Sequence, residues 1–312
     1  MRRSLPDLHP QARALLDGAW RPQSESVSPD IEAERGAYLQ TALELGGALE
    51  EVGRVEDLVV PGGDGARLRG RAHWPRVPAE ALGTILWLHG GGWYVGDVDA
   101  FDRVTRQLAN ASGAVCVSVD YRLAPEHRYP AAVDDARAVT AWLIGDGARE
   151  LGTDPGRVVV GGDSAGGNLA AVVGRSGEGL RAQLLVYPAL DAAMSGDAYG
   201  EFESGPFVSA ADMAFCWRTY LDGADPADPD ASPLMAADLG AAAPAYIAVA
   251  GHDPLRDDGL RYAQALRAAG VTVSLQRFDD MPHGFIRWGG VADRSRELIE
   301  ALAGYAREAI AR

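Results

Sequence analysis

The chain alternates between two patterns of hydrophobic and polar residues. Short runs of apolar and β-branched residues, typical of buried strands, are separated by longer stretches in which apolar residues recur every three or four positions, as on one face of a helix. The predicted strands lie near residues 54–60, 66–74, 84–89, 114–120, 157–162, 181–187, 245–250 and 271–278. The predicted helices lie near residues 98–111, 130–145, 165–174, 256–269 and 292–311. This alternation predicts an α/β fold, with a mostly parallel, eight-stranded sheet that helices cover on both faces.

Residues 193–236 interrupt the alternation between two strands of the predicted core. The segment is rich in aromatic residues, namely Phe202, Phe207, Phe215, Trp217 and Tyr220. We expect most of these rings to pack the segment onto the core and one or two to line a pocket. The predicted organisation is an N-terminal helical cap segment at 1–50, a core at 51–192 and 237–312, and an inserted cap segment at 193–236.

The sequence GGDSAGG at 161–167 has the G-x-S-x-G spacing of a nucleophile elbow, in which a serine sits on a sharp turn between a strand and a helix. In a chain with 38 glycines among 312 residues, this spacing alone carries little weight. Its context carries more, because a β-branched run at 157–162 precedes the motif and an apolar helical stretch follows it. Ser164 is therefore the predicted nucleophile, and we expect the neighbouring side chain of Asp163 to face away from it in a structural role.

A second glycine-rich sequence, HGGGW at 89–93, follows an apolar strand. Three consecutive glycines let the backbone approach a ligand closely and point its N–H groups at it. An isolated glycine run is usually only a turn, but beside a serine elbow it is typical of the loop that supplies part of an oxyanion hole. We expect Gly91, Gly92 and Ala165, the residue after the serine, to donate these N–H groups. His89, at the end of the strand, is expected to fix the loop.

His283 is the candidate general base by position and by elimination among the six histidines. It lies in the sequence MPHG at 281–284, which is predicted as a turn after the last strand, 271–278. Such a turn can hold an imidazole over the elbow. His252 stands beside an aspartate, but adjacent residues of an extended segment point in opposite directions, so the two side chains do not pair easily.

The acidic partner of this histidine has several candidates. They are Asp253, Asp257, Asp258, Asp279 and Asp280. Asp253 is preferred because it directly follows the strand 245–250, at the edge of the sheet where α/β proteins gather functional groups. Asp257 is the alternative. Its surroundings also fit the first turn of the following helix, where an acidic residue is favoured by the helix dipole without any catalytic role.

Taken together, these motifs resemble the hormone-sensitive-lipase-like family of α/β-hydrolase carboxylesterases, especially its bacterial GDSAGG members. The similarity extends in order from about residue 80 onward and rests on HGGGW, DYRLAPEHRYPAA at 120–132, GDSAGG, GHDPLRDD at 251–258 and PHGF at 282–285. The resemblance implies an α/β-hydrolase fold with a helical cap, a triad of Ser164, His283 and Asp253, an oxyanion hole made by the glycine loop and Ala165, and no cofactor.

The composition limits the partners of the chain. Its net charge of −15 argues against binding to nucleic acids or anionic membranes, and no segment approaches the roughly 18 apolar residues that span a bilayer. Cys116 and Cys216 lack metal-ligand spacing, so we expect buried free thiols and no metal site. We expect a small-molecule ester as the partner and a cytoplasmic location, and the sequence leaves room for a homodimer.

The expected function is that of a carboxylesterase that hydrolyses short-chain acyl esters through a serine acyl-enzyme intermediate. An amide or formamide hydrolase, or a specialised deacetylase, stays open because the triad by itself does not distinguish these leaving groups. The alternative outside catalysis is a small-molecule receptor. Plant gibberellin receptors resemble the same family but lack the triad histidine, and the presence of His283 disfavours this reading.

Overall fold

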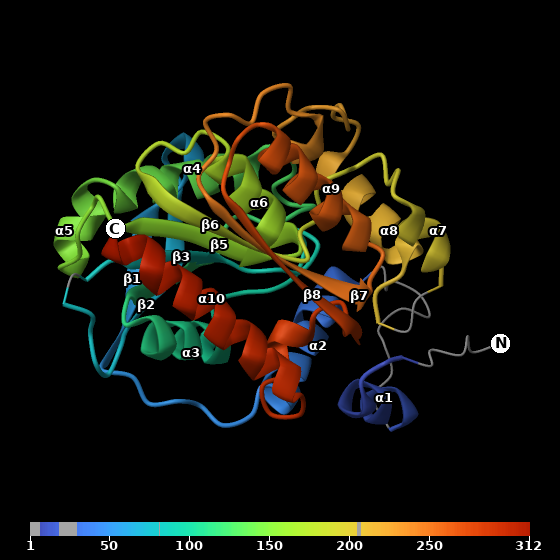
Figure 1. Ribbon diagram of the computed structural model, residues 1–312, viewed down its shortest axis with the longest axis horizontal. Coiled ribbons are helices and arrows are strands. Elements are labelled where there is room, and N and C mark those ends of the chain that lie inside the picture. Colours follow the sequence, from blue (N-terminus) through green and yellow to red (C-terminus); the bar gives the residue numbers. More distant parts are fainter. Residues whose placement is uncertain (1–6, 19–29, 81, 205–206) are drawn as a thin grey trace.

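The computed structural model describes residues 7–18, 30–80, 82–204 and 207–312, so parts of both predicted cap segments, 1–6, 19–29 and 205–206, lie outside the described residues. At its centre is an eight-stranded sheet with the order β1-β2-β4-β3-β5-β6-β7-β8 (Figure 1). The strands are β1 (Arg54–Pro61), β2 (Arg67–Trp74), β3 (Thr84–Leu88), β4 (Val115–Val119), β5 (Val158–Asp163), β6 (Leu180–Val186), β7 (Ala245–His252) and β8 (Val273–Pro282). β2 is antiparallel to β1 and β4, and the other neighbours are parallel. The predicted sheet is confirmed.

The central strands are buried along their whole length because helices cover both of their faces. Every residue of β3, β4 and β5 is buried. The edge strand β8 differs, since most of its residues are at least partly exposed. We predicted that this strand ends near residue 278 and that a turn follows at 281–284, but β8 continues to Pro282. This prediction was wrong because Asp279 and Asp280 are tolerated at an edge that faces water, although acidic residues are rare inside sheets.

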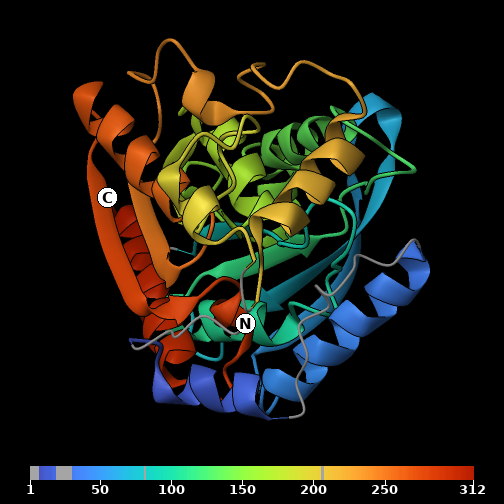
Figure 2. The same cartoon turned by 90° about the vertical axis from the view of Figure 1, so that its right-hand side faces the viewer.

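Helices form a layer on each face of the sheet (Figures 1 and 2). They are α3 (Asp102–Ser112), α4 (Ala131–Leu143), α5 (Asp146–Leu151), α6 (Ala165–Gly174), α9 (Arg256–Ala268) and α10 (Asp293–Ala311). On one face, Leu108 of α3 and Leu302 of α10 belong to the same apolar cluster as Trp87 of β3. On the other face, α4, α6 and α9 pack against alternate residues of the same strands. The five predicted helices are confirmed. Among the helices that cover the sheet, the short α5 is the one that was not predicted.

Two stretches that are far apart in the sequence lie together at the side of the molecule where β7 and β8 end, the side that Figure 2 faces. The helices of these stretches are α1 (Pro10–Asp17), α2 (Ile31–Leu45), α7 (Asp197–Glu201) and α8 (Ala210–Leu221). The guanidinium of Arg35 anchors α2, because it pairs with Glu126 at 2.7 Å and donates to the carbonyl of Tyr94 at 2.9 Å. α2 is thereby tied to the segment that follows HGGGW.

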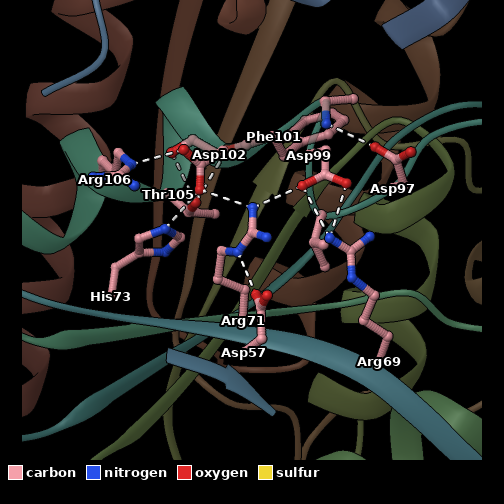
Figure 3. A network of polar contacts seen from close by, with 12 residues as sticks. Asp57, Arg69, Arg71, His73, Asp97, Asp99, Phe101, Asp102, Thr105 and Arg106 are labelled. Carbon is pink, nitrogen blue, oxygen red and sulfur yellow. Dashed lines mark hydrogen bonds and ion pairs between the residues drawn. The ribbon is translucent and has the colours of Figure 1, made fainter. Parts of the chain in front are cut away.

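A network of ion pairs fastens β2 to α3 (Figure 3). Asp102, at the start of α3, pairs with His73 of β2 at 2.9 Å and with Arg106 at 2.7 Å. Arg71 of β2 reaches Asp102 at 3.3 Å and Asp99 at 2.8 Å. Burial alone would raise the pKa of Asp102, but hydrogen bonds from His73 and Arg106 hold this pKa well below its usual range. Through Asp99, the network also fixes the loop that precedes α3.

Asp258, in the first turn of α9, joins the inserted segment to the core. Its Oδ2 accepts hydrogen bonds from the N–H groups of Leu190 at 2.9 Å and Asp191 at 3.2 Å, and from the hydroxyl of Tyr199 on α7 at 3.0 Å. Its Oδ1 is buried and has no hydrogen-bond partner among the described residues. Burial raises the pKa of Asp258 to about 8, and the charge of Asp191 acts in the same direction.

We predict that Asp258→Asn makes the stability of the protein less dependent on pH between about pH 5 and pH 8. The folded-state pKa lies above the value of about 3.9 for an unfolded Asp, so the folded protein binds more protons than the unfolded chain in this window. The free energy of unfolding therefore falls as the pH rises. An asparagine stays neutral, and its carbonyl oxygen can accept the same N–H bonds.

Urea unfolding at several pH values in this window measures the effect. Asp279→Asn is the control, because Asp279 is an exposed residue of β8. Equal pH dependence in the wild type and Asp258→Asn would contradict the raised pKa.

Candidate active site

Ser164 occupies a strained turn between β5 and α6. Its φ is 56° and its ψ is −117°. Such a conformation costs a residue with a side chain on the order of 1–3 kcal/mol, so the surrounding structure must hold it in place. The N–H of Ser164 donates to the carbonyl of Val186 at 2.9 Å. Gly166 packs so tightly against the carbonyl oxygen of Leu88 that a Cβ at this position would collide with it. The small residues of the motif are thus a packing requirement of the turn.

The structure brings Ser164, His283 and Asp253 into one chain of hydrogen bonds. His283 Nε2 lies 2.9 Å from Ser164 Oγ, and His283 Nδ1 lies 2.7 Å from Asp253 Oδ2. Asp253 is fully buried, and its other carboxylate oxygen accepts the N–H of Leu255 at 2.8 Å. A carboxylate beside Nδ1 favours the tautomer that carries its proton there, which leaves Nε2 free to accept the serine proton.

The pairing of β7 with β8 explains why two residues 30 positions apart meet. His252, the last residue of β7, is the register partner of Pro282, the last residue of β8. The next residue on each strand is Asp253 on one side and His283 on the other. Because the strands are parallel, both residues leave the sheet at the same edge, beside the carboxyl end of β5 that carries the serine. The extension of β8 therefore sets the position of His283.

The rival candidates for the base and the acid lie elsewhere. The ring of His252 packs against Phe202, with the ring centroids 6.3 Å apart. Asp257 accepts the N–H of Ala198, near the start of α7, at 2.8 Å, and pairs with Arg256 at 3.0 Å. Asp257 therefore holds the inserted segment, and neither residue joins the hydrogen bonds around Ser164.

The glycine loop presents unused N–H groups beside the serine. Gly91 and Gly92 have φ values of 124° and 58°, which glycine adopts more readily than other residues. Among the described residues, their N–H groups have no hydrogen-bond acceptor. The N–H of Ala165, the first residue of α6, likewise lacks a partner, as is usual at the start of a helix. The three predicted oxyanion donors are therefore available, whereas the N–H of Gly90 is already bonded to Asp163 Oδ1 at 2.9 Å.

Asp163 and His89 both contact Gly90 and thereby hold this loop in place. Asp163 is fully enclosed, and burial raises its pKa to about 6, although the positive charge of Arg287 and the N–H of Gly90 oppose the shift. His89 stacks on Tyr121 with ring centroids 4.3 Å apart, and its Nδ1 lies 2.8 Å from the carbonyl of Gly90. Burial lowers the pKa of His89, which favours the neutral ring. The contacts of both residues agree with the structural roles predicted for them.

A cavity of about 160 Å³ connects Ser164 and His283 with both cap segments. Tyr38 of α2 lines one part of it, and Met213 and Cys216 of α8 line another. Of the aromatic residues of the inserted segment singled out from the sequence, Phe207 lies in the wall of this cavity within the described ranges. Trp217 and Tyr220 instead pack against Trp93, with centroid distances of 4.4 Å and 4.5 Å. Most of these rings therefore join the cap to the core, as expected.

Sequence reasoning missed three charged residues of the cavity, namely Glu34, Asp212 and Arg287. Arg287 ends the short helix η4 (Phe285–Arg287), which directly follows His283 and Gly284, and its side chain lines the cavity. No motif pointed to it, because its position depends on how η4 packs beneath α2.

Other features of the described residues bear on the predicted chemistry. Cys116 and Cys216 are buried free thiols, as expected, and burial raises the pKa of Cys216 to about 12. In the same ranges, no three His, Cys, Asp or Glu side chains gather in a way that would hold a metal ion. A membrane-crossing helix, judged by length and apolar character, is not found among the described residues.

The comparisons with known proteins agree with this geometry. A family model described as the alpha/beta hydrolase fold matches residues 85–287. The chain is 40% identical to the carboxylesterase NlhH of Mycobacterium tuberculosis, over 94% of this chain and 93% of that protein. It is 34% identical to an ethyl acetate hydrolase of Pseudomonas putida, over 88% and 90% of the two chains. A hyperthermophilic esterase from Pyrobaculum calidifontis has a similar structure, with a TM-score of 0.87 and 38% identity over 96% of this chain and 98% of that one.

The family match covers more than half of the chain, and the relatives match nearly its full length. The fold of this chain, the elbow at Ser164 and the order of the motifs agree with that match. The chain therefore belongs to the α/β hydrolase family that its motifs indicated.

Proposed function

We propose that this protein is a carboxylesterase that hydrolyses short-chain esters through a covalent acyl-serine intermediate. The observation that carries the proposal is the hydrogen-bond chain from Ser164 Oγ through His283 to Asp253, at 2.9 Å and 2.7 Å. It lies beside N–H groups that have no acceptor among the described residues. The esterase names of the relatives support the choice of an ester as substrate.

The first half of the reaction forms the acyl-enzyme. Ser164 Oγ attacks the ester carbonyl carbon while His283 Nε2 takes the hydroxyl proton. The carbonyl oxygen becomes an oxyanion, and the N–H groups of Gly91, Gly92 and Ala165 stabilise it. The bond from carbon to the alcohol oxygen then breaks, and the imidazolium of His283 protonates the departing alcohol.

The second half releases the acid. A water molecule gives a proton to His283 Nε2 and attacks the acyl carbon. The bond between this carbon and Ser164 Oγ then breaks, the imidazolium of His283 returns the proton to Oγ, and the carboxylic acid leaves. Asp253 keeps the imidazole in its working tautomer and stabilises the imidazolium in both halves. Its carboxylate is well placed for this because it is buried and receives a second hydrogen bond from Leu255.

The size of the cavity beside Ser164 supports a short acyl group. Its volume is about 160 Å³, and a cavity of about 150 Å³ in another protein holds one benzene molecule, which has six carbon atoms. The cavity therefore has room for an acyl chain of similar size. The apolar side chains of Met213, Val208 and Phe207 in its wall suit a hydrocarbon chain.

We also place the enzyme in the cytoplasm, since two free buried thiols are typical of reducing compartments.

Ser164→Ala tests the proposed function. We expect kcat for p-nitrophenyl butyrate to fall on the order of 10⁶-fold, because the nucleophile is lost while the oxyanion donors stay. An organophosphate should add its phosphoryl mass to the wild type and leave Ser164→Ala unmodified in intact-protein mass spectrometry. Ser176→Ala, outside the cavity, is the control and should behave as the wild type. Full activity of Ser164→Ala would refute the mechanism.

Asp253→Asn tests the assignment of the acid. An asparagine can donate to Nδ1 and so stabilise the wrong tautomer of His283, which should lower kcat about 10⁴-fold while the fold is kept. Asp257→Asn should affect kcat far less, because Asp257 bonds to Ala198 and Arg256. Steady-state kinetics of the two variants give the ranking, and the reverse order would transfer the role to Asp257.

A series of p-nitrophenyl esters from acetyl to palmitoyl tests the acyl preference. Each methylene that is buried should add about 0.8 kcal/mol, so kcat/KM should rise over the first carbons and fall when the chain meets the cavity wall. We expect the best turnover between acetyl and hexanoyl esters and little with palmitoyl esters or emulsified triglyceride. Met213→Ala should move the optimum to longer chains, because it removes part of that wall. A palmitoyl preference, or activation at an oil–water interface, would identify a lipase instead.

A further inference from the structure

Arg287 lies in the wall of the catalytic cavity, and its side chain has no hydrogen-bond partner among the described residues. Its side chain lines the cavity together with Ser164 and His283. Its Nε and Nη1 atoms are enclosed by protein and reach no hydrogen-bond acceptor among the described residues. Enclosing a charged group in this way is unfavourable unless a partner compensates it. Nη2 is not among these enclosed atoms and has no hydrogen bond among the described residues, so it is the donor of Arg287 that a ligand in the cavity can reach.

Comparison with the other arginines sets Arg287 apart. Nearly all arginines of the described residues have an ion pair or a hydrogen bond, and the half-buried Arg71, for example, contacts Asp57 and Asp99. Five described arginines have no ion pair and no hydrogen bond from their side chains. Four of them are exposed to water, and the fifth, Arg287, is half-buried. The exposed ones are Arg67, Arg76, Arg218 and Arg312. Water satisfies those guanidinium groups, but it reaches Nε and Nη1 of Arg287 poorly.

Aromatic rings hold the guanidinium by its faces. Its central carbon lies 3.9 Å from the ring centroid of Tyr38 on α2 and 5.9 Å from that of Phe101. Stacking of this kind stabilises the cation but uses none of its N–H groups, which point outward from the edge of the guanidinium plane. Tyr38 therefore positions Arg287 and leaves the N–H groups of Nη2 available.

The neighbouring carboxylates supply no hydrogen bond to Arg287, although its charge acts on Asp163. Asp163 lines the cavity, but its Oδ1 accepts the N–H of Gly90 at 2.9 Å. Asp212 also lines it, and its Oδ2 accepts the N–H and the hydroxyl of Ser209 at 2.8 Å and 2.7 Å. Glu34 is the third carboxylate of the wall. With so many acidic groups nearby, the field of the cavity does not attract anions from a distance, so an anion gains only from direct contact with Arg287.

We propose that Arg287 binds a carboxylate carried by the substrate, and that the enzyme therefore prefers esters with a carboxylate in their acyl or alcohol part over neutral esters of the same shape. The proposal rests on the proposed esterase function. Nη2 carries two N–H groups, and a charge-assisted N–H bond from a guanidinium to a carboxylate is short and strong. Because Ser164 and Arg287 line one cavity, a short ester can reach both residues at once.

Two pairs of isosteric esters test the preference. Monoethyl succinate and ethyl 4-methylpentanoate have the same acyl shape, with a carboxylate in one and two methyl groups in the other. The acetate ester of 3-hydroxypropanoate and isopentyl acetate form the equivalent pair for the alcohol part. We would measure kcat/KM for all four by pH-stat with the wild type, Arg287→Met, Arg287→Lys and the control Arg218→Met.

We expect Arg287→Met to lower the ratio of kcat/KM between the charged and the neutral ester by about 10-fold or more in one of the two pairs, since a hydrogen bond to a charged group is strong. The neutral esters should change less than about threefold, and Arg287→Lys should keep part of the preference, because it retains the charge without the planar fork. Arg218→Met should leave the ratio unchanged. An unchanged ratio in both pairs, or an equal loss for charged and neutral esters, would overturn the proposal.

Binding separates this proposal from the proposed function. Calorimetric titration of monoethyl succinate and of 3-acetoxypropanoate into Ser164→Ala, with and without Arg287→Met, needs no turnover. Binding of either ester that is lost with Arg287 supports the carboxylate site even if the wild type hydrolyses none of the four esters. Hydrolysis of all four esters together with binding that does not depend on Arg287 would leave the esterase intact and remove the site.

Discussion

The strained backbone of Ser164 is the constraint on which the rest of the site depends. A positive φ at a serine is unfavourable, so the turn persists only because its surroundings leave no other conformation. The strands on either side and the close approach of Gly166 to Leu88 provide these surroundings. They place the hydroxyl at the carboxyl edge of the sheet and align the start of α6 with the oxyanion. Stability of the core and reactivity of the serine are thereby coupled.

Two further contacts carry this arrangement from the elbow to the rest of the site. Asp163, the residue before the serine, accepts a hydrogen bond from the N–H of Gly90 and so holds the glycine loop in position beside the nucleophile. The register of β7 with β8 ends at His252 and Pro282, which places Asp253 and His283 side by side. The nucleophile, the oxyanion donors and the base are therefore positioned by strands of one sheet. Such a rigid frame suits a reaction that depends on preorganised donors.

The cavity, by contrast, is completed by segments outside the sheet. α2 and α8 come from distant parts of the chain, yet both contribute side chains to the same wall. Arg35 holds α2 to the core through an ion pair with Glu126, and Asp257 holds α7, which precedes α8, through a hydrogen bond from Ala198. The triad thus lies at the edge of the sheet, whereas side chains of α2, α8 and η4 complete the wall of the cavity.

The sequence by itself determined the alternation of strands and helices, the elbow at Ser164, the glycine loop and the preferred acid and base. These features follow from local rules, because buried parallel strands need continuous apolar runs and a tight turn needs glycine. Tertiary structure alone decided that β8 continues through Asp279 and Asp280, that Asp163 bonds to Gly90, and that Arg287 faces the cavity. A charged residue at the edge of a sheet, or against a helix from another part of the chain, produces no periodic pattern of hydrophobic and polar residues in the sequence. Their surroundings are set by contacts between residues that are far apart in sequence.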